Sequence, residues 1–266
     1  MRIKLSLLAK NRSGNVLPVN YQYPFSSAIY KTMSRADEAY AAFLHEKGYR
    51  SKESLKTFKL FTFSDIHTPF TIKGDRLFMK TEEVDFMVCF HIPEAATNFI
   101  KGLFIDQQID IADKKSKVSF VVHQVEALPL WNIPVAPDEV KEVVLKPASP
   151  LIVGIINDKG YYDFLGPDDA RYLLMITHHI KEKHRVVYGD DVVEDDFKVF
   201  EVAVLDSDRA KSRLLTIKAG EPEETKIRGF VGFKLKIKAK VRVIELALNA
   251  GIGVYGSQGF GCVKEV

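Results

Sequence analysis

Near its C-terminal end the sequence reads Asn249-Ala250-Gly251-Ile252-Gly253-Val254-Tyr255-Gly256-Ser257-Gln258-Gly259-Phe260-Gly261, a glycine-rich stretch followed by five further residues. Glycine has no Cβ, so it adopts positive φ angles and lets backbone N–H groups come close to a bound group. These residues, called the glycine loop below, therefore suit a phosphate-binding loop. A dinucleotide site needs a following helix and a P-loop needs Lys-Ser or Lys-Thr after the glycines, so neither fits. A tight turn without a ligand is the alternative interpretation.

The composition allows one large hydrophobic core or two smaller ones. With 266 residues, 46% of them hydrophobic, the chain can form two domains of about 130 residues each, and this is what we expect. The net charge is +3 and the pI about 8.6. A polyanionic partner must therefore bind a local basic patch rather than the whole surface.

The expected location is the cytoplasm. Cys89 and Cys262 lie in apolar surroundings without a CxxC motif. They are typical of buried free thiols in a reducing compartment, although two cysteines leave one disulfide open. The sequence has no recognisable signal peptide and no run of 18 apolar residues, so we expect no membrane partner.

The first half of the sequence predicts alternating strands and helices. Residues 2–7 alternate polar and apolar side chains, which is typical of a half-buried strand. Two helices are expected at about 24–33 and 35–46, with Ser34 capping the second helix and Gly48 ending it. If these helices fold back on each other, Tyr30 and His45 come within roughly 10–15 Å. Strands are expected in residues 58–64, 76–80, 85–92 and 117–125, and a helix in 93–103.

The second half repeats the same order of elements. Three prolines in residues 129–137 indicate a linker between an N-terminal domain, 1–128, and a C-terminal domain, 138–266. The predicted fold is α+β, with two tandem ferredoxin-like (RRM-like) βαββαβ domains. Expected strands are 140–145, 151–156, 198–205, 213–218 and 229–238, and a last helix spans 240–249. A helix is also expected from Pro167 to about Lys183, with an apolar stripe at Ala170, Leu173, Leu174, Thr177 and Ile180.

The glycine loop resembles a known family signature. Gly251-Ile-Gly253, five residues and then Gly259-Phe-Gly261 resemble the C-terminal motif of the RAMP superfamily, in particular the CRISPR-associated endoribonucleases that cut repeat RNA. Shorter features in the same order extend the resemblance over nearly the whole chain: Tyr30, Leu44-His45, Lys59-Leu60-Phe61-Thr62, Ser149-Pro150-Leu151, Tyr188-Gly189 and Gly232-Phe233-Lys234.

The resemblance implies a role in antiviral defence and three catalytic residues. The implied reaction is cleavage of CRISPR precursor RNA within each repeat by 2′-OH attack, without metal or cofactor, leaving 2′,3′-cyclic phosphate and 5′-OH ends. His45 would be the base, since histidine titrates near neutral pH. Lys59 would stabilise the developing charge, and Tyr30 would orient the phosphate or protonate the leaving oxygen. The alternatives are a surface histidine, an exposed strand lysine and a core tyrosine.

A basic stripe precedes the glycine loop. Residues 226–242 contain seven lysines and arginines and no acid. Lys234, Lys236 and Lys238 alternate with apolar residues and should share one face of a strand. We expect RNA to bind this face, although a solvated sheet face is the alternative. The predicted RNA-binding residues are Lys234, Lys236, Lys238, Lys240, Arg242, Gly251, Gly253, Ser257, Gln258, Gly259, Phe260 and Gly261.

Two other functional classes stay open. The first is a non-catalytic protein that binds repeat RNA or serves as a structural subunit of a CRISPR interference complex. The second is a metal-dependent nuclease that uses the acids of residues 190–196. We expect no metal site, because His178, His179 and His184 do not have the i, i+4 spacing that places two imidazoles together. The expected partner is repeat RNA, with other CRISPR-associated proteins and a homodimer left open.

Overall fold

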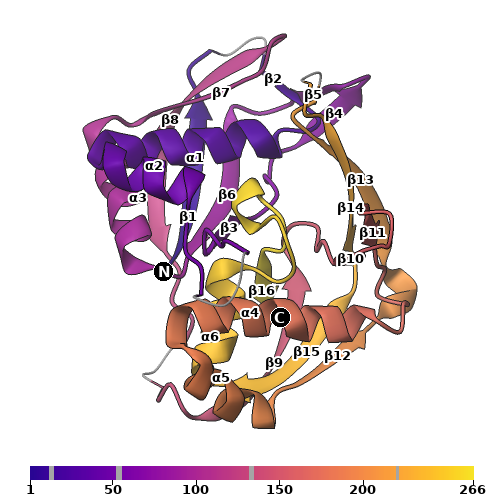
Figure 1. Cartoon of the computed structure of the whole chain (residues 1–266). Helices are drawn as coiled ribbons and strands as arrows, with labels where there is room; N and C mark the ends of the chain where they lie inside the picture. Colours follow the sequence, from indigo (N-terminus) through magenta and orange to yellow (C-terminus); the bar gives the residue numbers. More distant parts are fainter. Residues whose placement is uncertain (12–14, 52–55, 132–134, 220–221) are drawn as a thin grey trace.

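Two antiparallel sheets, one from each half of the chain, carry the helices of the protein (Figure 1). The computed structural model describes residues 1–11, 15–51, 56–131, 135–219 and 222–266. Within that part, no helix is long and apolar enough to cross a membrane. The predicted linker 129–137 falls partly outside the described residues, and the domain division stays a prediction.

The N-terminal sheet has the strand order β3-β6-β1-β8-β7. Its strands are β1 (Arg2–Ala9), β3 (Phe61–Phe63), β6 (Glu83–Phe90), β7 (Gln108–Ala112) and β8 (Lys117–Ala127). The helices α1 (Gln22–Ala36), α2 (Glu38–Glu46) and α3 (Pro93–Ile105) cover one face (Figure 1). The alternation predicted in β1 is confirmed, because Ile3, Leu5 and Leu7 point into the core under these helices. A small sheet, β2-β5-β4, is added by Val16–Pro18, Arg76–Met79 and Phe70–Lys73.

The C-terminal sheet has the strand order β12-β15-β9-β16. It is built from β9 (Val140–Pro147), β12 (Glu201–Leu205), β15 (Lys234–Lys240) and β16 (Val263–Glu265). The helices α4 (Tyr172–Tyr188) and α6 (Val241–Ala250) pack on it through a second core. Both halves therefore contain βαββαβ, and the predicted fold class is confirmed.

The remaining elements of the second half are short. Two hairpins pair β10 (Gly154–Ile156) with β11 (Tyr162–Phe164) and β13 (Lys211–Ile217) with β14 (Thr225–Val231). A helix α5 (Asp190–Asp196) and the 3₁₀ turns η1 (Phe197–Val199), η2 (Ser207–Arg209) and η3 (Gly256–Gln258) complete the described elements.

Two predicted boundaries in the first half are wrong. The break between α1 and α2 lies at Asp37, whose carboxylate accepts a hydrogen bond from the N–H of Tyr40 at 2.8 Å, so Ser34 is not the cap. The strand predicted from residue 58 begins only at Phe61, because Leu60 has a φ of 52°, outside the extended region. Lys59 therefore lies in a loop. Gly48, with a φ of 66°, does follow the end of α2 as predicted.

Two predictions in the second half also need correction. The strand expected over residues 229–238 is two strands, since the chain turns at Gly232 with a φ of 90°. The helix expected from Pro167 begins at Tyr172, and its buried face differs from the predicted stripe. Leu174 is 69% exposed, whereas Lys183 and His184 are buried. The pattern of apolar residues did not predict the buried face of α4 because that face contains polar side chains.

The two halves are joined by contacts that the sequence does not predict. Asp65, after β3, accepts a hydrogen bond from the Tyr21 hydroxyl at 2.9 Å and forms an ion pair with Arg213 on β13. Cys89 of β6 packs with Cys262, the residue after the glycine loop. Both cysteines are free and buried, so the prediction of buried free thiols is confirmed.

Close packing between α1 and α3 depends on Gly102. A Cβ at this position would lie 1.8 Å from the carbonyl oxygen of Thr32. We expect Gly102→Ala to lower the free energy of unfolding by about 1–3 kcal/mol, because the two helices must move apart. Chemical denaturation measures this. Thr97→Ala, an exposed change on the same helix, should stay close to wild type, and equal stability of both variants would contradict the packing argument.

Candidate active site around the glycine loop

The glycine loop is folded tightly against its own neighbours. Gly251, Gly253, Gly259 and Gly261 all have positive φ, between 73° and 84°. A Cβ on Gly253 would lie 2.2 Å from the carbonyl oxygen of Ile152, and one on Gly261 would lie 2.0 Å from that of Ile252. These glycines are therefore needed for the path of the backbone. The partly exposed portion of the loop is residues 254–258.

Hydrogen bonds fix the loop to both halves of the chain. The Ser26 hydroxyl on α1 donates to the carbonyl oxygen of Ser257 at 2.7 Å, and the Thr62 hydroxyl on β3 donates to that of Phe260 at 2.9 Å. On the other side, the N–H of Val254 donates to Ile152 O at 2.9 Å. The turn of residues 254–258 is thereby held between the two sheets.

Tyr30 and His45 are in direct contact. Their rings meet edge to face with centroids 4.9 Å apart, closer than the roughly 10–15 Å expected from helix geometry. Tyr30 also packs edge to face on Phe61 at 5.4 Å. Burial raises the pKa of Tyr30 to about 12, and a hydrogen bond with the Ser257 side chain opposes part of this rise. His45 itself is exposed at the last turn of α2, so its imidazole is accessible.

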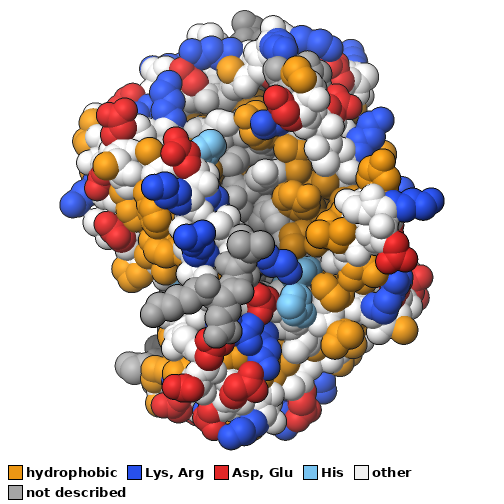
Figure 2. Space-filling model, in the orientation of Figure 1, with side chains coloured by type: hydrophobic (Ala, Val, Ile, Leu, Met, Phe, Trp, Pro, Cys, Tyr) orange, Lys and Arg blue, Asp and Glu red, His pale blue; other side chains and the backbone are white. Residues whose placement is uncertain are grey.

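Lys59 lines a pocket beside this pair. Its side chain passes over Gly48, where an added Cβ would lie 2.9 Å from Lys59 Cδ and 3.1 Å from Nζ. Burial lowers the pKa of Lys59. The pocket has a volume of about 310 Å³, and its wall includes Phe61 and Ser257, which both interact with Tyr30. Tyr30 and Lys59 therefore both lie near Ser257 of the glycine loop, and His45 contacts Tyr30. Figure 2 shows a hollow in this face of the protein, with apolar side chains along one wall and histidine and basic side chains at its edges.

Two protein-family models match this chain, one in each half. Residues 16–126 match the family described as "CRISPR-associated protein Cas6, N-terminal", and residues 134–265 match "CRISPR associated protein Cas6, C-terminal". The chain belongs to the Cas6 family. A relative from Methanocaldococcus jannaschii, named "CRISPR-associated endoribonuclease Cas6 1", is 27% identical over 100% of this chain and 93% of its own length.

Solved Cas6 structures share the fold over the whole chain. A Cas6-related protein from Pyrococcus furiosus superimposes with a TM-score of 0.79 at 22% identity, covering 100% of this chain and 98% of its own. A structure described as "CRISPR associated protein Cas6" gives 0.70 at 25% identity, covering 100% and 99%. A third, described as "An RAMP protein binding different RNA substrates", gives 0.77 at 20% identity, covering 100% and 99%. The family predicted from the sequence is therefore confirmed.

The basic stripe of this Cas6 family member is matched by acids from neighbouring strands. Lys234, Lys236 and Lys238 do share the outer face of β15. Each forms an ion pair, at 2.9, 3.5 and 2.7 Å respectively, with Asp206, Glu142 and Glu201. Because β9 and β12 pair with β15, acidic residues that are far away in the sequence come to lie beside the basic stripe. RNA binding by these lysines stays a prediction.

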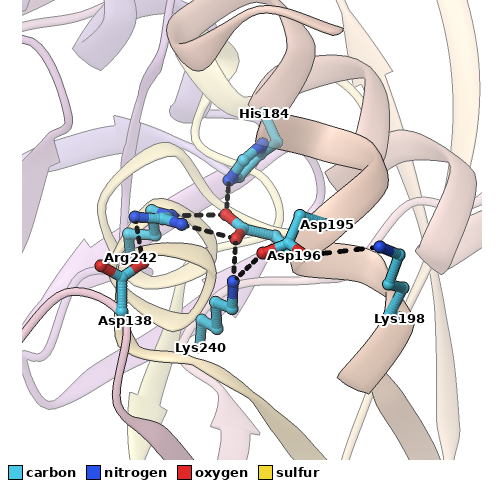
Figure 3. Close-up of polar contacts among 7 residues, drawn as sticks. All are labelled: Asp138, His184, Asp195, Asp196, Lys198, Lys240 and Arg242. Atoms are coloured by element: carbon cyan, nitrogen blue, oxygen red, sulfur yellow. Dashed lines mark hydrogen bonds and ion pairs between the residues drawn. The ribbon is translucent and has the colours of Figure 1, made fainter. Parts of the chain in front are cut away.

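Lys240 and Arg242 lie in a buried network rather than on an open face (Figure 3). Arg242 binds Asp196 through two hydrogen bonds of 2.5 and 2.7 Å, and Lys240 Nζ is 3.0 Å from the same carboxylate. His184 Nε2 lies 2.9 Å from it as well. Burial alone would raise the pKa of Asp196, but the hydrogen bonds from Arg242 and Lys240 outweigh it, so the pKa is lowered. This network joins α4 and α5 to the start of α6.

The structure also narrows two other expectations. Phe260, one of the predicted RNA-binding residues, is 1% exposed and packs in a small core, so its side chain is not open to a ligand. The acids of α5 form ion pairs with Arg185, Lys181 and Lys240. No group of three metal-binding side chains occurs in the part of the chain that the structure describes. The sequence reading also missed Lys183, a buried residue of α4 that lines the pocket.

Asp196 should be important for stability. Its side chain is fully buried, and Asp196→Asn would leave Arg242 and His184 facing a neutral amide. We expect the free energy of unfolding to fall by about 3 kcal/mol, as is typical when one partner of a buried ion pair is removed. Asp195→Asn, which changes an exposed neighbour, should keep a melting temperature close to wild type. A similar small change for both variants would show that the network contributes little.

Proposed function

We propose that this chain is a metal-independent endoribonuclease that cuts CRISPR precursor RNA within the repeat. Membership of the Cas6 family and a full-length relative named an endoribonuclease support RNA cleavage in CRISPR RNA processing. The observation that carries the chemistry is the contact between His45 and Tyr30 beside Ser257 and the Lys59 pocket. An exposed imidazole held against a buried phenol is a suitable arrangement for a general base.

In the proposed reaction the 2′-oxygen of one nucleotide attacks the phosphorus attached to the 3′-oxygen of the same ribose. His45 accepts the 2′-OH proton as the new P–O2′ bond forms. The P–O5′ bond then breaks, giving a 2′,3′-cyclic phosphate and a 5′-oxygen that must gain a proton. Lys59 stabilises the negative charge of the transition state. Because burial lowers the pKa of Lys59, it is also a better proton donor to the 5′-oxygen than an exposed lysine.

Tyr30 has a positioning role in this proposal. A phenol with a pKa of about 12 is a weak acid, so it does not donate its proton readily at neutral pH. Its ring instead fixes the orientation of the His45 imidazole, and its hydroxyl is held by Ser257. The resemblance implies that Tyr30 orients the phosphate or protonates the leaving oxygen, whereas the ring contact supports a different role, the positioning of the His45 imidazole.

Repeat RNA is the proposed partner, and residues 254–258 are its proposed contact in the glycine loop. Ser257 and Gln258 line the pocket. Among the described residues, Gln258 Oε1 is buried and accepts no hydrogen bond. If the Gln258 side chain turns into the pocket, this oxygen can accept a hydrogen bond from a donor such as the 2′-OH, the group that distinguishes RNA from DNA. Lys234, Lys236 and Lys238 are proposed as a second contact, in which phosphates replace the acids now paired with them.

Replacement of His45 tests the base. We expect His45→Ala to slow cleavage of end-labelled repeat RNA by about 10²–10⁴-fold in excess EDTA, while affinity for the RNA changes little. The wild-type protein should not cleave a repeat RNA that carries a 2′-deoxy sugar at the cut site. His123→Ala, an exposed change on β8, is the matched control and should cleave normally.

Three outcomes would contradict this proposal. Unchanged cleavage by His45→Ala would remove His45 from the reaction. Cleavage that EDTA abolishes would favour a metal-dependent nuclease. Tight binding without any cleavage by the wild type would favour a non-catalytic repeat-RNA-binding protein.

Tyr30→Phe tests the positioning role. We expect cleavage to fall by about 10-fold, because the hydroxyl bond to Ser257 is lost while the ring contact with His45 remains. The shape of the rate profile between pH 6 and 9 should stay the same, since a group with a pKa of about 12 does not titrate in that window. Loss of an alkaline limb in the variant would instead identify Tyr30 as the acid. Tyr161→Phe, at an exposed site, is the control.

A further inference from the structure

Lys183 is a buried lysine at the junction of α6 and the glycine loop. Its side chain reaches from α4, is 6% exposed, and donates to the carbonyl oxygens of Ala250 and Gly251 at 3.1 and 2.6 Å. These carbonyls belong to the last residue of α6 and the first glycine of the loop. The negative end of a helix dipole favours a cation at this position.

When it is protonated, the Lys183 amine has one more N–H donor than these two hydrogen bonds use. An ammonium group has three N–H donors, and two of them are directed at carbonyls. Lys183 also lines the pocket that contains Lys59 and Ser257. Among its described residues that pocket has no carboxylate, and Lys183 forms no ion pair in the described part of the chain. A buried ammonium without an anion is unfavourable, so an anion entering the pocket would find a ready partner.

We propose that Lys183 binds a phosphate oxygen of the RNA backbone in this pocket, and that it takes up a proton when the RNA binds. This inference rests on the proposed function, because it identifies RNA as the anion. It adds a phosphate-binding residue on α4, in the same pocket as Lys59. The geometry also links the ligand to the loop, since the same amine holds the carbonyls that precede residues 254–258.

The protonation state of Lys183 follows from its surroundings. Burial lowers the pKa of Lys183 to about 7, so the free protein holds a mixture of amine and ammonium at neutral pH. A neutral amine keeps two N–H groups for the two carbonyls, whereas only the ammonium has a third donor for a phosphate. An anion nearby favours the ammonium and raises the pKa. RNA binding above neutral pH therefore requires proton uptake.

Other titratable groups lie around the pocket and must be distinguished from Lys183. His179, one turn before Lys183, has a pKa lowered to about 3 by burial and by the charges of Lys183 and its neighbours. The pKa of His178, whose Nε2 is 3.3 Å from Lys56 Nζ, is also lowered by burial. Lys56 and Lys59 line the same pocket, where burial lowers the pKa of Lys59 and raises that of Tyr255. A substitution of Lys183 is needed to assign the proton.

The experiment is titration calorimetry with repeat RNA that carries a 2′-deoxy sugar at the cut site. Measuring the binding enthalpy in two buffers of different ionisation enthalpy gives the number of protons taken up. For wild type we expect about half a proton at pH 7 and close to one at pH 8, as a pKa near 7 that rises on binding requires. Lys183→Met should bind about 10-fold more weakly at pH 7 and lose this uptake.

Lys183→Arg is the decisive variant, because arginine stays protonated at every pH used. We expect it to bind RNA with no linked proton and with an affinity that is nearly constant from pH 6.5 to 8.5. Lys181→Met, on the same helix but paired with Glu194, should keep the wild-type uptake and affinity. Melting temperatures identify any variant that fails to fold.

Either of two results would overturn the proposal: uptake in Lys183→Arg equal to wild type, or no uptake by the wild type itself. Cleavage of unmodified RNA by the same samples is measured in parallel. Cleavage with no Lys183-dependent uptake refutes this inference alone, whereas absence of cleavage refutes the proposed function.

Discussion

The rest of the structure depends on the tight path of the glycine loop, in which Gly253 lies against Ile152 and Gly261 lies against Ile252. Carbonyl oxygens of these residues lie within 2.2 Å of where a Cβ would be on Gly253 and Gly261, so no other amino acid follows this path without displacing the chain. The tight path brings Ser257 next to α1 and Phe260 next to β3. One loop of the second half thus lies beside the proposed catalytic residues Tyr30, His45 and Lys59, which belong to the first.

Much of the fold could be predicted because it is encoded locally. The alternation in β1 and the positive φ angles of the loop glycines are encoded within a few residues, and the structure shows both. The end of α1 was missed because Ser34 and Asp37 are both acceptable caps, and only tertiary packing selects between them. The buried face of α4 was missed because Lys183 and His184 are polar, and their burial is made favourable by partners about 67 and 12 residues away.

The candidate site shows the same division between local and distant information. The family resemblance predicted Tyr30, His45 and Lys59 as catalytic residues, and in the structure Lys59 shares a pocket with Ser257 while His45 packs against Tyr30. The basic stripe was read without its partners, since Glu142, Glu201 and Asp206 come beside it only when β9 and β12 flank β15. Lys240 and Arg242 are likewise paired with acids of α5, so part of the positive charge in the sequence supports the fold. A run of lysines in a sequence therefore gives the charge of a segment but not the charge of the surface around it.

The attachment of the glycine loop to both sheets has a consequence for the RNA. Ser26 and Thr62 hold the loop from one side and Ile152 holds it from the other, so the turn at residues 254–258 has little freedom to adapt to a ligand. In the proposed reaction, the conformational adjustment needed for in-line attack then falls on the nucleotide, which would have to leave its stacked helical geometry to reach His45. Flexible, unpaired repeat RNA loses the least free energy in that adjustment, and a stable stem at the cut site would have to be melted first.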